Sequence, residues 1–363
     1  MGHHRSCLLV CAGVALFTTT GVAQPVARPD MGFFPLANPE GVARWEGSQV
    51  DLSLASSLDT FAPSRSVVPR EYVGFNLRLR PRFYFTRHFQ LRASWSVTAE
   101  LTDTPYTTTT TKNEARAGDP AFSLWFHGIP AFAGVRASLA AWLQVPVSPE
   151  SRARTLILGT GFEAQLARRF ERALGGRLDL IGGIGFYKAF HEFTTPGVRG
   201  EYPYSRACGG GTAITTCLNS QLSAGYNTSH ALSLSLLVAP RWSWFSPGVL
   251  LAMTHAWSYA PTEPSPISPG GTSNYNSSSL FAFWFDFIPA AWVTVELGYQ
   301  FARASIVDAD GTYGNPFYSQ YGSPLLYVNA AFSIDEIARA ILQEPPGQGG
   351  IYRARSRPGA LSL

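Results

Sequence analysis

From Arg70 onward the sequence repeats segments of about ten residues in which apolar and polar side chains alternate, separated by turn-forming stretches. The clearest pair of segments runs from Tyr72 to Leu101. Its first half places these residues on one phase: Val73, Phe75, Leu77, Leu79, Phe83 and Phe85. The other phase holds Asn76, Arg78, Arg80, Arg82 and Tyr84. Because successive residues of a β-strand face opposite sides, each segment predicts a strand with one apolar and one polar face.

The composition limits how such strands assemble. Hydrophobic residues make up 45% of the chain and aromatic residues 13%, yet no apolar run reaches the roughly 20 residues that a membrane-spanning helix needs. Inside a bilayer the backbone must satisfy its own hydrogen bonds, which leaves a closed barrel as the other way to span it. We therefore predict an all-β fold, a transmembrane antiparallel up-and-down β-barrel. The net charge of +4 is too small to indicate a nucleic-acid partner.

The first residues are typical of a secretory signal peptide. A basic start ending at Arg5 leads into an apolar stretch, and the small residues of Gly21 to Ala23 provide a cleavage site after Ala23. A lipoprotein signal ending at Cys11 is the alternative, but the apolar stretch before it is short. We predict a signal peptide over 1–23, a short periplasmic segment over 24–48, the barrel over 49–334 and a periplasmic tail over 335–363.

The alternation predicts about twelve strands, with boundaries that are uncertain by a few residues. The predicted strands are Gln49–Leu58, Glu71–Phe85, Phe89–Thr102, Asp119–His127, Phe132–Val145, Thr155–Arg168, Leu174–Phe193, Ala231–Trp244, Gly248–Ala260, Ser277–Phe287, Ala291–Ser305 and Pro324–Ser333. Short connections, such as Arg169–Ala173 and Phe245–Pro247, alternate with long ones, such as Asp103–Gly118. Barrels of the Gram-negative outer membrane place short turns in the periplasm and long loops outside. We therefore predict that the protein lies in the outer membrane, with its lipid as a partner.

The polar phase of the strands is assigned to the barrel interior, and this set contains the candidate transport residues. They are Arg78, Arg80, Arg82, Arg92, Arg136, Arg177, Arg241, Glu100, Glu163, Asp179, Asp286 and Glu296. Two interpretations remain open. The groups either pair as salt bridges that fill a narrow barrel, or an arginine ladder at Arg78, Arg80 and Arg82 attracts anions into a pore. We favour the first interpretation.

After cleavage, Cys208 and Cys217 are the remaining cysteines, and both lie in one glycine-rich loop. In an oxidising compartment this spacing predicts a disulfide. Two cysteines without nearby histidines fall short of a closed zinc site, so we predict no metal and no cofactor.

Enzymatic patterns do not fit this chain. A serine and histidine that act together on one strand must lie two residues apart, whereas His230 precedes Ser233 by three residues. The stretch Leu158-Gly159-Thr160-Gly161-Phe162-Glu163-Ala164 imitates a dinucleotide-binding fingerprint, but its context is a series of alternating strands rather than a βαβ unit. We predict that the protein is not an enzyme, and that glycines such as Gly159 and Gly161 relieve crowding in the barrel interior.

The segment before the first strand gives a family resemblance. Asn38, Pro39 and Gly41 belong to the stretch Asn-Pro-Glu-Gly-Val-Ala-Arg, which resembles the Asn-Pro-Ala-Gly-Leu-Ala-Arg stretch of FadL-type outer-membrane transporters. The resemblance covers about thirteen residues and the general barrel pattern. It implies transport of hydrophobic or aromatic compounds through a barrel, which in that family has fourteen strands.

Together these features predict a passive channel or facilitator for small hydrophobic or aromatic compounds. Two alternatives stay open: a narrow, arginine-lined pore that prefers anions, and a closed structural or adhesive barrel whose long loops contact external partners. The sequence does not specify the substrate, the oligomeric state or whether the interior is open.

Overall fold

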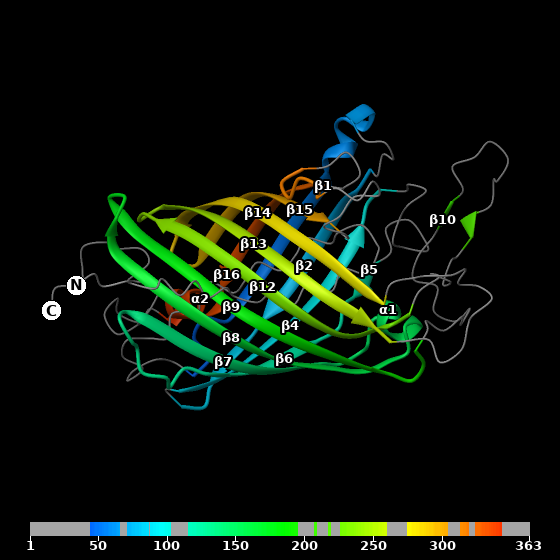
Figure 1. Ribbon diagram of the computed structural model, residues 1–363. Helices are drawn as coiled ribbons and strands as arrows, with labels where there is room; N and C mark the ends of the chain where they lie inside the picture. Colours follow the sequence, from blue (N-terminus) through cyan, green and yellow to red (C-terminus); the bar gives the residue numbers. More distant parts are fainter. Residues whose placement is uncertain are drawn as a thin grey trace, which may run out of the picture.

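Antiparallel strands dominate the structure, a computed structural model (Figure 1). It describes residues 44–65, 71–86, 88–102, 115–194, 207–208, 217–218, 226–259, 274–303, 313–318 and 324–342. The strands of the main sheet are β1 (Gln49–Ser57), β2 (Val73–Arg80), β3 (Arg82–Tyr84), β4 (Phe89–Glu100), β5 (Ala115–Ala117), β6 (Ala121–Phe126), β7 (Val135–Gln144), β8 (Leu156–Ala173), β9 (Gly176–His191), β12 (Thr228–Arg241), β13 (Phe245–Ser258), β14 (Tyr275–Ala290), β15 (Val293–Arg303) and β16 (Leu325–Ser333).

The sheet closes on itself. Most strands pair with their neighbours in the chain, β1 pairs with both β2 and β16, and β2 pairs with β4. Pro81 separates β2 from β3, and residues 118–120 separate β5 from β6, so each of these pairs forms one wall strand. The fourteen strands of the sheet therefore make a closed barrel of twelve wall strands. The predicted fold class and strand number are confirmed.

The connections divide the barrel into two ends. Short turns join β3 to β4, β6 to β7, β8 to β9, β12 to β13 and β14 to β15 at one end, which we call the turn end (Figure 1). The helix α2 (Ile334–Leu342) follows β16 at this end. The opposite end, which we call the loop end, carries the long connections, the short helices η1 (Leu58–Thr60) and η2 (Pro63–Arg65), and α1 (Pro149–Ala153).

The strands run further toward the turn end than predicted. The stretches 169–173 and 245–247, predicted as turns, belong to β8 and β13. The β8–β9 turn is formed by Leu174 and Gly175, both with positive φ. The error has a physical cause, because Arg168, Arg169, Glu171 and Arg172 break the apolar alternation while the backbone ladder continues. A second correction concerns β5, which lies in the predicted loop Asp103–Gly118.

Side chains replace backbone pairing where the wall is interrupted between β5 and β6. Asp119 accepts hydrogen bonds from the backbone N–H groups of Val147 and Ser148, at 2.8 and 2.7 Å. Ser148 caps α1 by accepting from the Ser151 N–H. Arg116 Nη1 also lies 2.8 Å from a carboxylate oxygen of Glu150. These contacts hold the β7–β8 connection against the wall at the loop end.

The outer face of the barrel is apolar. Exposed side chains on it include Leu54, Phe75, Phe122, Leu139, Phe186, Leu251, Phe285, Leu297 and Val328. Water would make such a surface prone to association, whereas acyl chains solvate it. Within the described residues, no helix is long and apolar enough to cross a membrane. The outer face therefore defines the molecule as a transmembrane barrel that crosses with strands.

Several predicted features lie outside the described residues. They are the signal peptide over 1–23, residues 24–43 of the predicted periplasmic segment with the motif residues Asn38, Pro39 and Gly41, and the tail after 342.

Candidate functional site: the interior wall of the barrel

All twelve predicted transport residues lie on the phase of their strands that faces the interior. Arg82, Arg92, Glu100, Asp179, Asp286 and Glu296 are buried, whereas Arg78, Arg80, Arg136, Glu163, Arg177 and Arg241 are partly buried. Sequence reasoning missed three further charged residues on this phase: Asp51, Arg116 and Arg169. Most of the charges gather in three regions of the wall, one on β1 to β4, one at the turn end of β8, β9 and β12, and one on β14 and β15.

The first region contains the predicted arginine ladder. Arg80 forms an ion pair with Asp51, with Nε 2.6 Å from Oδ2 and Nη2 2.7 Å from Oδ1. Arg92 donates from Nε to Gln90 at 2.7 Å. Arg82 packs over Gly47. Arg78 differs from these neighbours, since its side chain makes no hydrogen bond or ion pair within the described part of the chain, although the carboxylates of Asp51 and Glu296 attract it. The salt-bridge interpretation therefore describes Arg80, and the same carboxylate, Asp51, also attracts Arg78.

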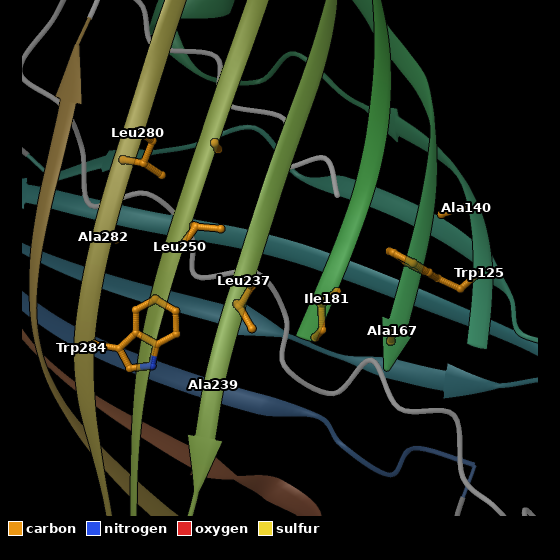
Figure 2. Close-up of a cluster of buried hydrophobic side chains, with 11 residues drawn as sticks. Trp125, Ala140, Ala167, Ile181, Leu237, Ala239, Leu250, Leu280, Ala282 and Trp284 are labelled. Atoms are coloured by element: carbon orange, nitrogen blue, oxygen red, sulfur yellow. The ribbon is translucent and has the colours of Figure 1, made fainter. Parts of the chain in front are cut away.

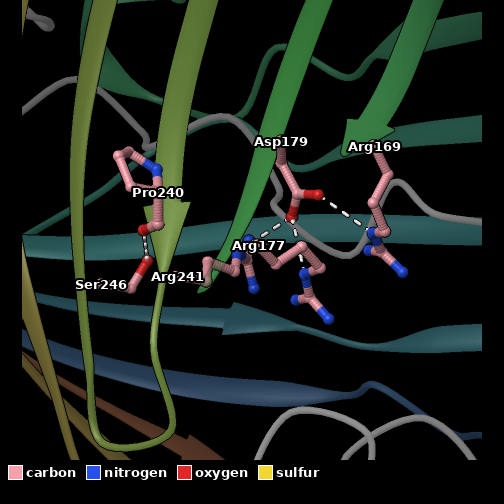
Figure 3. A network of polar contacts seen from close by, with 6 residues as sticks. All are labelled: Arg169, Arg177, Asp179, Pro240, Arg241 and Ser246. Carbon is pink, nitrogen blue, oxygen red and sulfur yellow. Dashed lines mark hydrogen bonds and ion pairs between the residues drawn. The ribbon is translucent and has the colours of Figure 1, made fainter. Parts of the chain in front are cut away.

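The second region is a cluster of three arginines around one carboxylate (Figure 3). Asp179 is fully buried, and the Nε atoms of Arg169 and Arg241 each lie 3.0 Å from one of its oxygens. The Nε atom of Arg177 lies 3.6 Å from Oδ2. All three side chains approach through Nε, so the terminal Nη groups extend beyond the carboxylate. We call these four residues the arginine cluster.

Two carboxylates meet on the wall between β14 and β15. Asp286 and Glu296 are direct cross-strand partners, and both are buried. The Tyr327 hydroxyl donates to Glu296 at 2.7 Å. Like charges in this position repel each other unless neighbouring donors stabilise them. This pair lies beside the β1 to β4 region, so acidic and basic groups adjoin on that side of the interior.

The opposite side of the interior is apolar, which the sequence analysis did not predict. Eleven buried hydrophobic residues from β6 to β14 form one cluster on the inner wall (Figure 2). Leu237 and Trp284 are 1% exposed, and Ile181, Leu250 and Leu280 are each 2% exposed. The sequence does carry a signal for this cluster. The inward positions of β12 are first serines and an alanine, and then Leu237 and Ala239. Assigning every inward position to the polar phase concealed it.

Five residues of this cluster are consecutive cross-strand partners. Ala167 pairs with Ile181, Ile181 with Leu237, Leu237 with Leu250, and Leu250 with Ala282. We call these five residues the apolar row. It continues through Gln300 to Leu325 in one direction and to Arg136 in the other.

The tilt of the strands gives this row a direction along the barrel. Leu325 begins β16 at the loop end, whereas Arg136 is the second residue of β7 at the turn end. A row perpendicular to tilted strands winds around the barrel and descends from one end to the other. The apolar row is therefore an inclined strip along the inner wall rather than a ring.

Aromatic rings near this strip lie flat on glycines of the neighbouring strand. A Cβ atom on Gly248 would overlap the Trp284 indole, and one on Gly298 would overlap the Tyr327 ring. Gly161 likewise lies beneath Trp142, whose ring stacks on Tyr187 with centroids 5.2 Å apart. Glycine permits this close approach because it has no side chain. The dinucleotide-like motif is thus part of β8, as its barrel context predicted.

One serine–histidine contact was also missed. His127, in the β6–β7 turn, places Nδ1 2.9 Å from the Ser138 hydroxyl, although the two are eleven residues apart. Burial, together with the positive charges of Arg92 and Arg82, lowers the pKa of His127 to about 3. A histidine with such a pKa is a weak general base. No group of three or more metal-ligating side chains occurs within the residues that the structure describes.

The predicted disulfide partners face each other across a small two-stranded sheet. In β10 (Ala207–Cys208) and β11 (Cys217–Leu218), Cys208 is the direct partner of Cys217. This register brings the two backbones to a separation that a disulfide can bridge. The bond itself stays a prediction.

The closed wall, its apolar outer face and its mixed inner face define a transmembrane β-barrel. No family model matches the chain, and no curated protein is similar to it. Among solved structures, it is similar to the COG4313 outer membrane channel from Pseudomonas putida F1, with a TM-score of 0.46 and 10% identity over 82% of this chain and 99% of that chain.

Two further solved structures have different functions. The beta domain of the Bordetella autotransporter BrkA gives a TM-score of 0.37 and 10% identity over 80% of this chain and 100% of that one. Outer membrane phospholipase A from Escherichia coli gives 0.34 and 11%, over 82% and 97%. Similarity of this degree concerns barrel architecture alone, and the resemblance to FadL-type transporters gains no family-level support from it.

Proposed function

We propose that the protein is an outer-membrane channel through which small hydrophobic or aromatic compounds diffuse passively. The apolar row is the observation that supports this proposal most strongly. A water-filled barrel has no need of five consecutive apolar partners on its inner wall. The strip descends between the two ends, and because its side chains are at most 6% exposed, a compound moving along it takes the place of the groups that cover them.

The magnitude of this contact is suited to facilitated diffusion. Covering roughly 80 Å² of an aromatic ring is worth about 2 kcal/mol at the usual value per unit of apolar area. That free energy concentrates the compound on the strip by about thirtyfold relative to water. It is small enough to allow release, which a passive channel requires. The similarity of the N-terminal stretch to FadL-type transporters agrees with this substrate class.

Uptake of a neutral aromatic compound tests the proposal. We expect cells with intact lipopolysaccharide to take up radiolabelled naphthalene faster when they produce the protein than when they lack it. Heat-modifiable migration on gels provides the amount of folded barrel for normalisation. Equal uptake by both strains would overturn the proposal and favour a closed structural or adhesive barrel.

A second candidate function is a narrow pore that prefers anions. Arg78 supports it, since the side chain of this interior arginine makes no hydrogen bond or ion pair within the described residues. If the pore carries anions, Arg78→Gln will shift the reversal potential in planar bilayers toward that of an unselective channel. Arg152→Gln is the control, because Arg152 is exposed on α1. An unchanged reversal potential in Arg78→Gln would remove this candidate.

A further inference from the structure

A band of basic and aromatic side chains crosses the outer face of the barrel near the loop end. Lys188, His230, Trp257 and Tyr275 are consecutive cross-strand partners on β9, β12, β13 and β14. His255 lies two residues before Trp257, on the same face of β13. All five occupy the outward phase of their strands and are half-buried or exposed. We call these five residues the outer basic patch.

The rings of the outer basic patch are packed in two pairs. His230 stacks on Trp257, with ring centroids 5.0 Å apart and an interplanar angle of 13°. His255 stacks on Tyr275, and its Nδ1 atom lies 2.6 Å from the Tyr275 hydroxyl. Neither histidine forms a hydrogen bond through Nε2 within the described part of the chain. Stacking therefore orients both imidazoles and leaves one ring nitrogen of each to a ligand.

Lys188 provides the positive charge of the patch. Its Nζ atom donates to the Ser229 hydroxyl at 2.7 Å, and it lies 5.1 Å from the centre of the Tyr259 ring and 5.8 Å from that of Phe190. An ammonium group has three donors. Lys188 has no further hydrogen bond and no ion pair within the described residues. Because Phe190 is 44% exposed on the outer face, the ammonium group lies at a surface that an external group can reach.

No acidic side chain accompanies this charge. In the described part of the chain, the outward positions at the loop end of β8, β9, β12, β13 and β14 carry neither aspartate nor glutamate. Glu192 follows β9 four residues after Lys188, which places it about 13 Å further along the chain. The patch therefore has a positive potential that favours an anionic partner.

The outer face becomes apolar directly below the patch. Toward the turn end, the next outward partners are Phe186 with Leu232, followed by Ile184, Leu234 and Met253 in one row. The patch thus marks the border of the apolar belt at the loop end, where lipid headgroups meet acyl chains. A ligand with a charged headgroup and acyl chains matches both parts of this surface.

The opposite border of the same strands has a different composition. At the turn end, Trp244, Phe245 and Phe287 form a cluster of rings on the outer face. Within the described residues, no outward position of β9, β12, β13 or β14 at that end carries a basic side chain. An aromatic girdle is expected at both borders of a barrel, so it accounts for the turn end but not for Lys188 and the two histidines.

We propose that the outer basic patch binds a phosphate group of a phosphorylated glycolipid of the outer leaflet, the lipid A part of lipopolysaccharide. The Lys188 ammonium and the His230 imidazole contact the phosphate oxygens, and the acyl chains lie on the apolar side chains below. Charge complementarity and the continuity of the patch with the apolar belt favour this lipid over a soluble ligand. The site is independent of what passes through the interior.

Native mass spectrometry of the refolded barrel in an uncharged detergent tests the proposal. The two probes are lipid A with its phosphates and the same lipid A after enzymatic removal of the phosphates. We expect the phosphorylated lipid to bind the unmodified barrel about tenfold more tightly, as the loss of one charge-assisted hydrogen bond implies. Equal affinities for the two lipids would overturn the proposal.

Two outward cations at opposite ends of the barrel provide matched variants. Lys188→Gln removes the cation of the patch, whereas Arg168→Gln removes an exposed arginine near the turn end of β8 that packs over Phe170. We expect Lys188→Gln to weaken binding of phosphorylated lipid A about tenfold and Arg168→Gln to leave it unchanged. An equal effect of the two variants would contradict the assigned site.

A competition experiment separates the lipid from a soluble anion. An excess of inorganic phosphate should not displace bound lipid A, because the acyl chains contribute to binding. Displacement would identify a site for soluble anions and would contradict the proposal. If Lys188→Gln yields too little folded barrel, the ratio of the affinities for the two lipids in the unmodified protein and in Arg168→Gln still decides it.

Discussion

The two sides of the barrel interior differ in chemistry although they belong to one closed sheet. On β1 to β4 and β14 to β15 the inward positions carry charged groups such as Asp51, Arg80 and Glu296. On β8 to β14 the equivalent positions form the apolar row. The outer face shows no such division, because every strand there meets the same acyl chains.

This difference shows which constraints act on each face. Lipid requires an apolar outer surface around the whole barrel, so the outer face carries little information about function. The inner face is free to vary, and its division into charged and apolar sides is the feature on which the proposed function rests. The following predictions test whether the two sides differ as described, beginning with the largest expected effect.

The arginine cluster at the turn end should depend strongly on Asp179. Asp179→Asn leaves three guanidiniums close together without their shared carboxylate, and we expect the free energy of unfolding to fall by about 3 kcal/mol. Urea unfolding in lipid vesicles, followed by tryptophan fluorescence, measures this change. Glu171→Gln is the control, because Glu171 is exposed on the neighbouring strand β8. A loss below about 0.5 kcal/mol in Asp179→Asn would show that the carboxylate does not organise the cluster.

The apolar side should depend on the close approach of Trp284 to Gly248. Gly248→Ala forces the buried indole away from the wall, and we expect a loss of about 2 kcal/mol with a red-shifted tryptophan emission. Gly175→Asn is a suitable control, since Gly175 has open space around it and asparagine tolerates its positive φ. Unchanged stability and emission in Gly248→Ala would mean that the ring does not lie on this glycine.

His127 lies where the two sides meet, stacked on Trp125 and near Arg82 and Arg92. Its pKa is about 3 in the folded barrel and about 6.5 in the unfolded chain, so the unfolded chain takes up a proton first as the pH falls. Its contribution to stability is therefore present above pH 6.5 and is lost progressively below it.

Because His127 is partly exposed, we expect about 1 kcal/mol to be lost between pH 7.5 and pH 5.5. In His127→Asn this part of the pH dependence should disappear. Urea unfolding of both proteins at the two pH values measures the difference. Parallel pH dependence in the two proteins would place the titration on another group.

The outer face and the strand number could be predicted from the sequence, because lipid imposes a strict period of two on the outward residues, such as Phe281, Phe283 and Phe285. It located the charged inward residues for the same reason. It missed the apolar row, since an inward leucine such as Leu250 next to an outward leucine such as Leu251 interrupts the alternation without revealing its cross-strand partners. Register decides which residues adjoin, and turn length, rather than composition, sets the register.

The central claim is that the apolar side of the interior carries the substrate, and matched pairs of leucines test it directly. Leu237 and Leu250 face inward and are direct partners, whereas Leu236 and Leu251, also partners, face the lipid. The measurement is naphthalene uptake per folded barrel by cells producing Leu237→Asn with Leu250→Asn, or Leu236→Asn with Leu251→Asn. We predict that the inward pair lowers uptake severalfold and that the outward pair leaves it unchanged. Equal uptake by the two double variants would contradict the account.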